Sequence, residues 1–458
     1  MDKPPPILRK SNEMSVNQRN DNEQTTTSTT SSTSTTSSTS TKSTTTAPVQ
    51  AVRHWYKEEI IPGDRYHGRC YSPPNSKRVT HPMAADDIAR VLSKKFTISE
   101  RTLTDIREAV DLNILSINQS DSNNIKIILG YHGYEHTPHY TWYNFTHCNY
   151  TNCIALNPHR SLSHPMAPHN VTSAASVVLF NLVEMYRGQT LPDIPRRPDQ
   201  YFGVTSLEST GYSFNLMPDT LNGKMNMTLT YKRDSTVPEW HIFKACISRR
   251  PEKKPSVNYS SGKTRGAIAY VSNCFSMQYD RLSIMRELRK HIPVDIFGRC
   301  ETADPCKGQG RECSVKLHSQ YRFYLAFENS LCKDYISEKF WDRLSEPTYL
   351  LPVAMGGLSV REYAEQVPQN SFIHLRNFTS VGGLGRYLKK LMADDDTYNR
   401  YHEWRRDWEA FKRPIYSRFP ACDLCRIANE KPYMPADERL SEKYNNPAHC
   451  DTYQPIFD

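Results

Sequence analysis

The sequence predicts an α/β protein with two lobes, each built on a parallel sheet, behind a disordered Ser/Thr-rich stem. From about Ile125 onward, short apolar runs alternate with amphipathic stretches, a pattern typical of parallel sheets covered by helices on both faces. Arg249–Lys263 is rich in Lys, Pro, Ser and Gly and divides this region in two. Thr25–Thr46 contains only Ser and Thr apart from Lys42, so it cannot bury apolar surface and should stay extended.

These features predict five consecutive segments. A disordered stem over 1–53, either an O-glycosylated stalk or a plain linker, precedes a helical neck over 54–120. The neck carries two helix-like stretches, Met83–Lys95 and Thr102–Leu115. An N-terminal lobe over 121–250 and a C-terminal lobe over 263–413 should face each other across a cleft, and 414–458 form a tail with a Cys-x-x-Cys.

Within the lobes, each expected element follows from its apolar pattern. The expected strands are Ile125–Leu129, Ser176–Phe180, Tyr201–Val204, Met227–Tyr231, Ala267–Ser272, Val294–Phe297, Phe323–Phe327, Tyr349–Val353 and Phe372–His374. The expected helices are Asp280–His291, Tyr335–Leu344, Val360–Gln366, Leu384–Met392 and Thr397–Phe411.

Charge and hydropathy exclude several classes of protein. The 458 residues include 58 Lys and Arg and 49 Asp and Glu, a formal net charge of +9. The basic residues are dispersed without an aromatic–basic stripe, so no nucleic-acid partner is expected. The composition is not that of a collagen or a coiled coil. No apolar run approaches the ~20 residues of a membrane-spanning helix.

Cysteines and glycosylation sequons point to the secretory pathway. The chain has twelve cysteines, and disulfides persist in that compartment. Candidate glycosylation sites begin at Asn118, Asn144, Asn149, Asn170, Asn226, Asn258 and Asn377. The first residues lack the apolar segment of a signal peptide, so either the sequence is truncated or an anchor was lost in gene prediction.

The segment Phe323–Leu344 is the most informative for function. An apolar strand ends at Phe327, and a short loop with Asn329 leads to a helix that begins near Tyr335. Ligands of open α/β sheets bind beyond the carboxyl ends of strands, and free N–H groups at a helix start favour phosphate. Lys339 could therefore meet a phosphate and Glu338 a sugar hydroxyl, although a solvated helix start is an equal alternative on spacing alone.

This segment closely resembles the signature of the inverting α1,3-fucosyltransferases, F-E-N-S followed by D-Y-[IV]-[ST]-E-K. The resemblance covers roughly residues 126–426, and further landmarks follow in the family's order. They are Leu229–Ser235 (with Lys232 in place of an Arg), Val271, Ser272, Asn273, Arg281, Leu288, Val294–Arg299 and Tyr401–Arg405 before the Cys-x-x-Cys.

The resemblance implies a GT-B fold with two Rossmann-like lobes, the acceptor sugar in the first and GDP-fucose in the second. Arg281 and Lys339 would neutralise the diphosphate, because fixed cations can take up the charge of a leaving group without a metal. Asn329, Tyr335 and Glu338, with Ser272 and Asn273, would contact the nucleotide or the fucose. No tightly bound cofactor is implied, and a divalent cation could stimulate the reaction without being required.

Inverting transfer needs a carboxylate that takes the proton of the attacking hydroxyl. The family carries this base in a Glu-Ser-Pro element after a strand of the first lobe. The matching stretch here ends in Glu208, Ser209 and Thr210, so the resemblance implies Glu208 as the base. Thr210 replaces the family's usual Pro. Without the resemblance, a Glu in this position would be interpreted as an ordinary surface residue.

Other motifs favour structural roles. Asp394, Asp395 and Asp396 have a metal-like spacing, but they precede a predicted helix, where capping is the favoured interpretation. We therefore expect no metal site. Cys274 and Cys332 follow strands that should be neighbours, so they are a candidate pair. The family implies that Cys148 and Cys153 bond to Cys422 and Cys425. The cluster Cys300, Cys306 and Cys313 resembles an insertion of invertebrate members, and Cys70, Cys246 and Cys450 stay unassigned.

The resemblance implies transfer of L-fucose from GDP-fucose to O3 of a GlcNAc in a glycoprotein glycan, in the Golgi lumen. Family members are membrane-associated, whereas no spanning segment is expected in this chain. Two alternatives stay open. The acceptor could be the core GlcNAc of an N-glycan rather than an outer-arm GlcNAc, since the signature does not cover acceptor loops. The chain could also be a catalytically weak, secreted glycan-binding relic.

Overall fold

The computed structural model describes residues 79–98, 100–111, 115–131, 145–146, 148–156, 169–186, 190–211, 216–237, 245–274, 278–412 and 421–457. The described residues all belong to one compact unit. The predicted stem, Cys70 and Asn144 lie outside the described residues.

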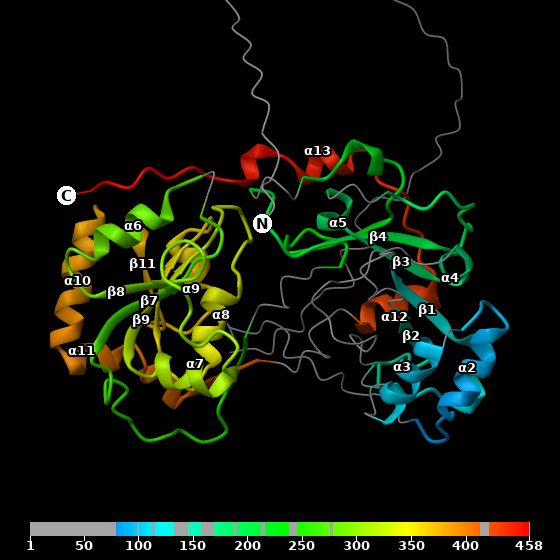
Figure 1. The fold of residues 1–458 in the computed structure, drawn as a ribbon, viewed down its shortest axis with the longest axis horizontal. Helices are drawn as coiled ribbons and strands as arrows, with labels where there is room; N and C mark the ends of the chain where they lie inside the picture. Colours follow the sequence, from blue (N-terminus) through cyan, green and yellow to red (C-terminus); the bar gives the residue numbers. More distant parts are fainter. Residues whose placement is uncertain are drawn as a thin grey trace, which may run out of the picture. The chain divides into compact units, whose positions relative to one another are not determined.

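The N-terminal lobe is built on a five-stranded parallel sheet. Its strand order is β2-β1-β3-β4-β5, and every neighbouring pair is parallel. The strands are β1 (Lys126–Gly130), β2 (Cys153–Leu156), β3 (Val177–Asn181), β4 (Tyr201–Ser206) and β5 (Met227–Thr230). Figure 1 shows this lobe on the right, with α4 (His169–Ala174) and α5 (Leu182–Tyr186) beside the strands.

The C-terminal lobe repeats this topology, although the sequence shows no internal repeat. Its parallel sheet has the order β11-β10-β9-β7-β8, so the first strand of each lobe lies between the second and third. The strands are β7 (Arg265–Tyr270), β8 (Val294–Phe297), β9 (Tyr321–Phe327), β10 (Leu351–Met355) and β11 (Ile373–His374). The helices are α6 (Arg281–Leu288), α7 (Gly310–His318), α8 (Glu338–Ser345), α9 (Val360–Ala364), α10 (Val381–Ala393) and α11 (Asp395–Arg400).

Strand β9 shows why these apolar runs form a buried parallel sheet. All seven of its residues are buried. Phe323, Leu325 and Phe327 pack into one hydrophobic core, while Tyr324 and Ala326 pack into a second one. Alternate side chains of a strand point to opposite faces, so both faces of this sheet are covered. All nine predicted strands are present, with bounds shifted by up to two residues, and they confirm the predicted α/β class.

The predicted neck does not form a separate segment where it is described. Its two helices are α2 (Ala85–Ser93) and α3 (Glu100–Asp111). Ile88 and Ile106 from these helices share one hydrophobic core with Leu129 of β1 and Phe180 of β3. The boundary predicted at residue 120 therefore divides segments that pack together, and α2 and α3 belong to the N-terminal lobe.

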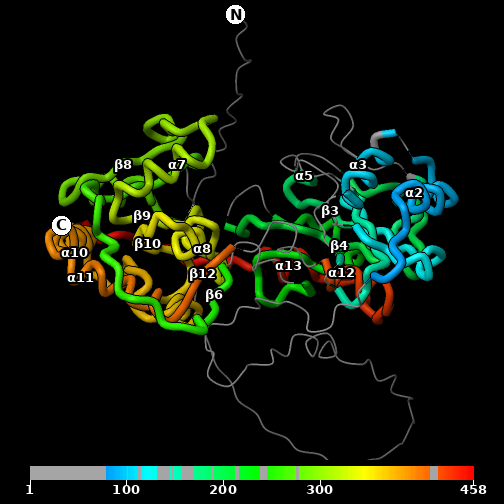
Figure 2. The backbone as a smooth tube through the Cα atoms, turned by 90° about the horizontal axis from the view of Figure 1, so that it is seen from below, coloured from blue at the N-terminus to red at the C-terminus, as the bar shows by residue number. Residues whose placement is uncertain are grey.

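The helix predicted over Thr397–Phe411 is wrong. Helix α11 ends at Arg400, a 3₁₀ turn covers Glu403–Arg406, and Trp408–Phe411 forms strand β12. Strand β12 pairs antiparallel with β6 (Cys246–Arg249), and Figure 2 shows the two strands side by side. Pairing with a strand about 160 positions earlier overrides the local helical pattern.

Two predicted disulfides tie the C-terminal tail to the N-terminal lobe. Cys148 bonds to Cys422 and Cys153 bonds to Cys425, as the resemblance implied. Cys422 and Cys425 lie on α12 (Ala421–Glu430), and the tail continues through α13 (Leu440–Tyr444), whose Leu440 enters the core of the N-terminal lobe.

The pairing of Cys274 with Cys332 is wrong. Cys274 bonds to Cys300, and Cys332 bonds to Cys450 from the tail. Cys306 and Cys313 bond to each other in the insertion before β9. Sequence position alone could not reveal that the tail passes over Cys332.

Removing either Cys148–Cys422 or Cys153–Cys425 alone should lower the free energy of unfolding only slightly, because the other of the two disulfides still closes almost the same loop. The sequence separations are 274 and 272 residues. Replacing all four cysteines (Cys148, Cys153, Cys422 and Cys425) with Ser should lower the free energy of unfolding by about 2–4 kcal/mol. Urea unfolding of the two double variants and the quadruple variant measures this. Two equal losses that add up to the quadruple loss would contradict it.

Candidate active site

The site lies at the carboxyl ends of the strands. Each sheet has a topological switch point there, the place where the strand order reverses. In the C-terminal lobe this switch lies between β7 and β9, and ligands of open α/β sheets bind at such a position. Ser272 and Asn273 follow β7, and Glu328 and Asn329 follow β9. The topology therefore collects residues from two of the predicted motifs at one edge of the sheet.

Glu208 follows β4 of the N-terminal lobe and contacts the signature segment directly. Its Oε2 accepts hydrogen bonds from Asn329 Nδ2 at 3.1 Å and from the Tyr335 hydroxyl at 3.2 Å. Burial, followed by the charge of the Glu208 carboxylate, raises the pKa of Tyr335 well above its usual range. The Tyr335 hydroxyl therefore stays protonated and donates, so the structure brings three predicted site residues together.

Arg281 joins the ends of the two switch-point strands. Its Nη1 donates to the Phe327 carbonyl at 3.2 Å and its Nη2 to the Asn273 carbonyl at 2.6 Å. The residue is 3% exposed, and its Nε has no hydrogen-bond partner among the described residues. Ser272, in contrast, is exposed. A buried guanidinium that donates to two carbonyls is held rigidly beside the site.

Lys339 lies in the first turn of α8 within a cluster of charged and polar groups. Its Nζ is 3.1 Å from both Ser337 Oγ and Glu338 Oε1, and 3.9 Å from Glu328 Oε2. Burial alone would lower the pKa of Lys339, but the Glu328 and Glu338 carboxylates outweigh it and raise the pKa. The Arg281 charge opposes this rise, so the two predicted cations act on the same region.

Glu328 is a site residue to which the sequence assigned no role. It is fully buried, and its two carboxylate oxygens accept from the Ser337 N–H at 2.8 Å and the Ser337 hydroxyl at 2.6 Å. Ser337 is the N-cap of α8. Glu328 therefore links the end of β9 to the start of α8, and its only sequence signal was its place within F-E-N-S.

The free energy of unfolding should fall as the pH rises from about 4.5 to 6, because Glu328 loses its proton over this range. Burial raises its pKa from 4.5 to about 6 against the opposing Lys339 charge, so the folded state binds the proton more tightly than the unfolded chain. This shift corresponds to about 2 kcal/mol of stability, present below pH 4.5 and lost above pH 6. Glu328→Gln should remove that loss in unfolding titrations at pH 4.5 and 6.5.

Glu301→Gln is the matched control for this titration. Burial opposes the shift, but Arg289 and Arg286 lower the pKa of Glu301, so its contribution is lost only as the pH falls below 4.5. The control should leave the difference between pH 4.5 and 6.5 largely unchanged. An unaltered difference in Glu328→Gln would show that Glu328 does not titrate in this range.

Residues around Glu208 and Tyr335 connect the two lobes further. Tyr231 of the N-terminal lobe packs edge-on against Tyr335, with ring centroids 5.2 Å apart. Arg233 Nε lies 3.3 Å from a carboxylate oxygen of Asp334, which adopts a left-handed backbone with φ of 67°. A non-glycine residue in this region requires support from its surroundings.

Asp394 caps helix α11, as predicted. Its carboxylate accepts from the Thr397 N–H at 2.9 Å and from the Thr397 hydroxyl at 2.6 Å. The neighbouring Asp395 bonds to Arg322 at 2.6 Å. Across the described ranges, no group of three or more His, Cys, Asp or Glu side chains could hold a metal ion. In the same ranges, no helix is long and apolar enough to cross a bilayer.

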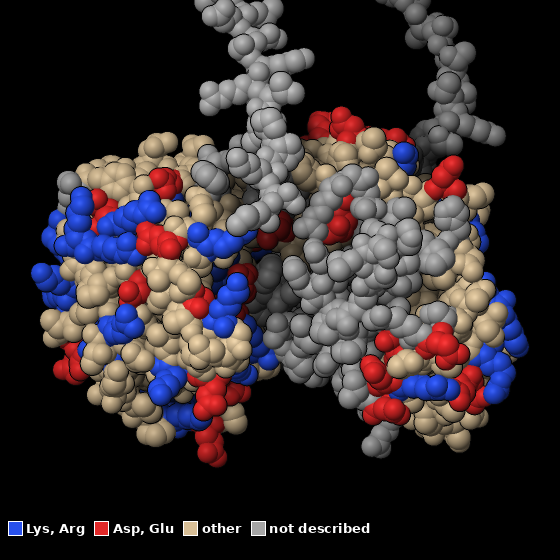
Figure 3. Space-filling view, in the orientation of Figure 1, with Lys and Arg blue, Asp and Glu red and all other residues tan. Residues whose placement is uncertain are grey.

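The described glycosylation candidates differ in accessibility. Asn149, Asn170, Asn258 and Asn377 are exposed, and Asn118 is half-buried. The side chain of Asn226 is engaged inside the protein, because its Nδ2 donates to the Met434 carbonyl at 2.7 Å and its Oδ1 accepts from the Phe202 N–H. On the face drawn in Figure 3, basic and acidic side chains are interspersed over the described surface.

Comparison with known protein families finds two models that match consecutive parts of the chain. The model "Fucosyltransferase, N-terminal" matches residues 123–240, and "Glycosyltransferase family 10 (fucosyltransferase) C-term" matches residues 260–442. Together they cover both sheets and every residue described above as part of the site.

Several curated proteins are similar to the chain. It is 31% identical over 290 residues to glycoprotein 3-alpha-L-fucosyltransferase A of Drosophila melanogaster, covering 62% of this chain and 55% of the relative. It is 33% identical to alpha-(1,3)-fucosyltransferase C of the same organism (54% and 59% covered) and 31% identical to alpha-(1,3)-fucosyltransferase fut-1 of Caenorhabditis elegans (52% and 56%). The chain thus spans little more than half the length of these relatives. A solved α1,3-fucosyltransferase with GDP-fucose aligns at a TM-score of 0.42 and 13% identity, over 68% of this chain and 93% of that one.

Proposed function

The chain belongs to glycosyltransferase family 10, the fucosyltransferases, and we propose that it transfers L-fucose from GDP-fucose to O3 of a GlcNAc in a glycoprotein glycan. The observation that carries this proposal is the contact of Glu208 with Asn329 and Tyr335. It places a carboxylate of the first lobe against the signature segment of the second. The names of the fly and nematode relatives, which are all 3-fucosyltransferases, support fucose transfer to a 3-position.

In the proposed reaction Glu208 is the general base. It takes the proton from O3 of the acceptor while O3 forms a bond to C1 of fucose. The bond from C1 to the phosphate oxygen breaks on the opposite side, and its electron pair leaves with GDP, so the anomeric configuration inverts. Hydrogen bonds from Asn329 and Tyr335 hold the carboxylate in one orientation, which is the geometric requirement for such a base.

The leaving diphosphate gains negative charge, and Arg281 and Lys339 are the cations proposed to stabilise it. Arg281 is fixed by the carbonyls of Phe327 and Asn273 and needs little rearrangement. Lys339 contacts Glu338, a half-exposed carboxylate, so donor binding would exchange this contact for a phosphate. Glu338 would then be available to a sugar hydroxyl of the donor.

The acceptor is the open part of the proposal. Purified protein should be incubated with labelled GDP-fucose and three acceptors: N-acetyllactosamine, GalNAc-GlcNAc and a trimmed N-glycan core. Transfer to either disaccharide supports an outer-arm GlcNAc, and transfer to the trimmed glycan alone supports the core GlcNAc. NMR of the product identifies the linkage and its anomeric configuration. GDP binding without transfer to any of the three would favour a glycan-binding relic and contradict the proposal.

We propose a lumenal location in the Golgi for this activity. Five disulfides form among the described residues, and such bonds persist in oxidising compartments. Four exposed sequons, at Asn149, Asn170, Asn258 and Asn377, would be accessible to glycosylation there. Digestion with an N-glycosidase, followed by mass spectrometry, identifies which of them carry glycans.

A further inference from the structure

The signature segment between Asn329 and Tyr335 is held by the C-terminal tail. Cys332 bonds to Cys450, and the two residues also form an antiparallel bridge. On either side of this bridge, the Lys333 N–H donates to the His449 carbonyl at 2.7 Å, and the Asp451 N–H donates to the Leu331 carbonyl at 2.8 Å. The backbone between two residues that contact Glu208 is therefore paired with the tail.

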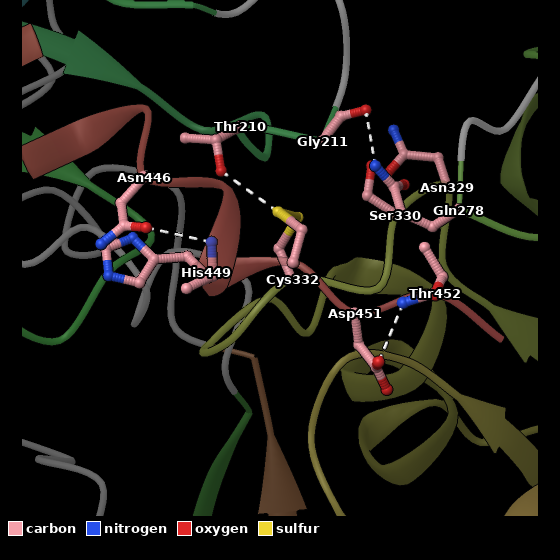
Figure 4. Close-up of a disulfide and its surroundings, with 12 residues drawn as sticks. Thr210, Gly211, Gln278, Asn329, Ser330, Cys332, Asn446, His449, Asp451 and Thr452 are labelled. Carbon is pink, nitrogen blue, oxygen red and sulfur yellow. Dashed lines mark hydrogen bonds between the residues drawn. A yellow bond between two sulfur atoms is a disulfide. The ribbon is translucent and has the colours of Figure 1, made fainter. Parts of the chain in front are cut away.

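The same disulfide contacts the loop that carries Glu208. Thr210 Oγ1 is 3.3 Å from Cys450 Sγ, and the Thr210 N–H donates to the Tyr231 hydroxyl at 3.2 Å. Figure 4 shows the Thr210 side chain pointing toward the disulfide at Cys332. A Cβ on the neighbouring Gly211 would lie 2.8 Å from Cys332 Sγ, so the loop packs closely on the disulfide. Thr210 supplies a hydroxyl and an N–H here, neither of which the family's usual Pro could provide.

The tail is fixed on both sides of the disulfide. Before it, Asn445 exchanges two hydrogen bonds of 2.8 Å with the backbone of Met217 in the N-terminal lobe. After it, Asp451 forms an ion pair of 2.8 Å with Arg376 in the C-terminal lobe. Figure 1 shows the tail in red, running from α13 to the C-terminus. A tail anchored in this way can hold Cys450 at a defined position.

We propose that the Cys332–Cys450 disulfide and Thr210 are positioning elements for the reaction. They hold the loop of Glu208 and Thr210 at a fixed position relative to the signature segment, so that Asn329 and Tyr335 can orient the Glu208 carboxylate. This inference rests on the proposed fucose transfer. It adds a function for the tail, which lies outside the signature segment.

The test removes the disulfide and compares turnover with GDP binding. In Cys332→Ser/Cys450→Ser, kcat per GDP-binding site should fall by about 10–100-fold, because misplacing a reacting group by 1 Å costs on the order of 100-fold. The Kd for GDP should change by less than about 3-fold, since Arg281 and Lys339 keep their contacts. Isothermal titration calorimetry gives both the Kd and the fraction of sites that bind GDP. It should be carried out at a temperature well below that of thermal unfolding.

Two further variants separate positioning from general stability. Cys306→Ser/Cys313→Ser removes the disulfide of the insertion and should leave kcat per binding site unchanged. Thr210→Val retains all disulfides and the shape of the side chain but loses the hydroxyl, and it should lower kcat several-fold at unchanged GDP affinity. The proposal is wrong if the Cys332→Ser/Cys450→Ser variant has a lower fraction of GDP-binding sites but an unchanged kcat per site. It is also wrong if this variant and Thr210→Val both have the kcat of wild type. If wild type itself transfers no fucose in this assay, the proposed function fails instead.

Discussion

Glu208→Gln is expected to lower kcat for fucose transfer by about 10²–10⁴-fold, the usual contribution of a general base. The amide cannot take the proton of O3 at neutral pH, but its oxygen can still accept from Asn329 and Tyr335, so the local geometry should persist. The Kd for GDP should remain within about 3-fold of wild type, because the proposed phosphate contacts come from Arg281 and Lys339. Steady-state kinetics at saturating GDP-fucose, together with calorimetric GDP binding, measure both quantities.

Asp193→Asn is the control for this substitution. Asp193 is an exposed carboxylate of the same lobe, so its neutralisation changes the net charge equally without reaching the site. Its kcat should match that of wild type. If Glu208→Gln had a kcat similar to that of wild type and Asp193→Asn, another group would have to take the proton. The assignment of Glu208 as the general base would then be wrong.

Removal of the Lys339 charge is expected to weaken donor binding and to slow transfer. A single Lys339→Ala change would leave the buried Glu328 without its cation, which is strongly unfavourable. The informative comparison is therefore Lys339→Ala/Glu328→Gln against Glu328→Gln alone. Loss of one fixed group that stabilises developing charge costs about 10²–10³-fold. We expect kcat/KM for GDP-fucose to fall by this factor, with a raised donor KM.

Lys290→Ala is the matched control, because Lys290 is an exposed lysine of the same lobe that forms an ion pair with Glu287. Its donor KM should not change. Arg281→Lys tests the second cation, since it keeps the charge but loses the fork that joins the Phe327 and Asn273 carbonyls. An unchanged donor KM in both the Lys339 and the Arg281 variants would contradict their assignment to the diphosphate.

Local patterns predicted nine of the twelve strands among the described residues and missed β2, β6 and β12. The nine were recognisable because a strand that is buried on both faces has to be continuously apolar. The run Phe323–Phe327 is an example, and the structure extends it to Tyr321. Asp394 was equally predictable as a cap, since the carboxylate bonds the N–H three residues later. Such signals are complete within a few neighbouring residues, and no distant contact is needed to interpret them.

Predictions failed where a distant segment determined the outcome. Trp408–Phe411 becomes a strand because β6 is there to pair with it, and Cys332 bonds to Cys450 because the tail crosses the signature segment. Glu328 had no assigned role for a different reason, because its contact with Ser337, nine residues later, spans an irregular loop that no local pattern describes. None of these contacts has a periodicity that could be recognised along the chain.

The α/β class, nine strands in their order along the chain and, through the long signature, the residues of a proposed donor site all follow from the sequence alone. The contact of Glu208 with Asn329 and Tyr335, and the pairing of the tail with the segment between these two residues, arise only when the lobes pack. The physical reason is that propensity and hydrophobic pattern act between near neighbours. The relative placement of residues more than 100 positions apart depends on how whole elements pack.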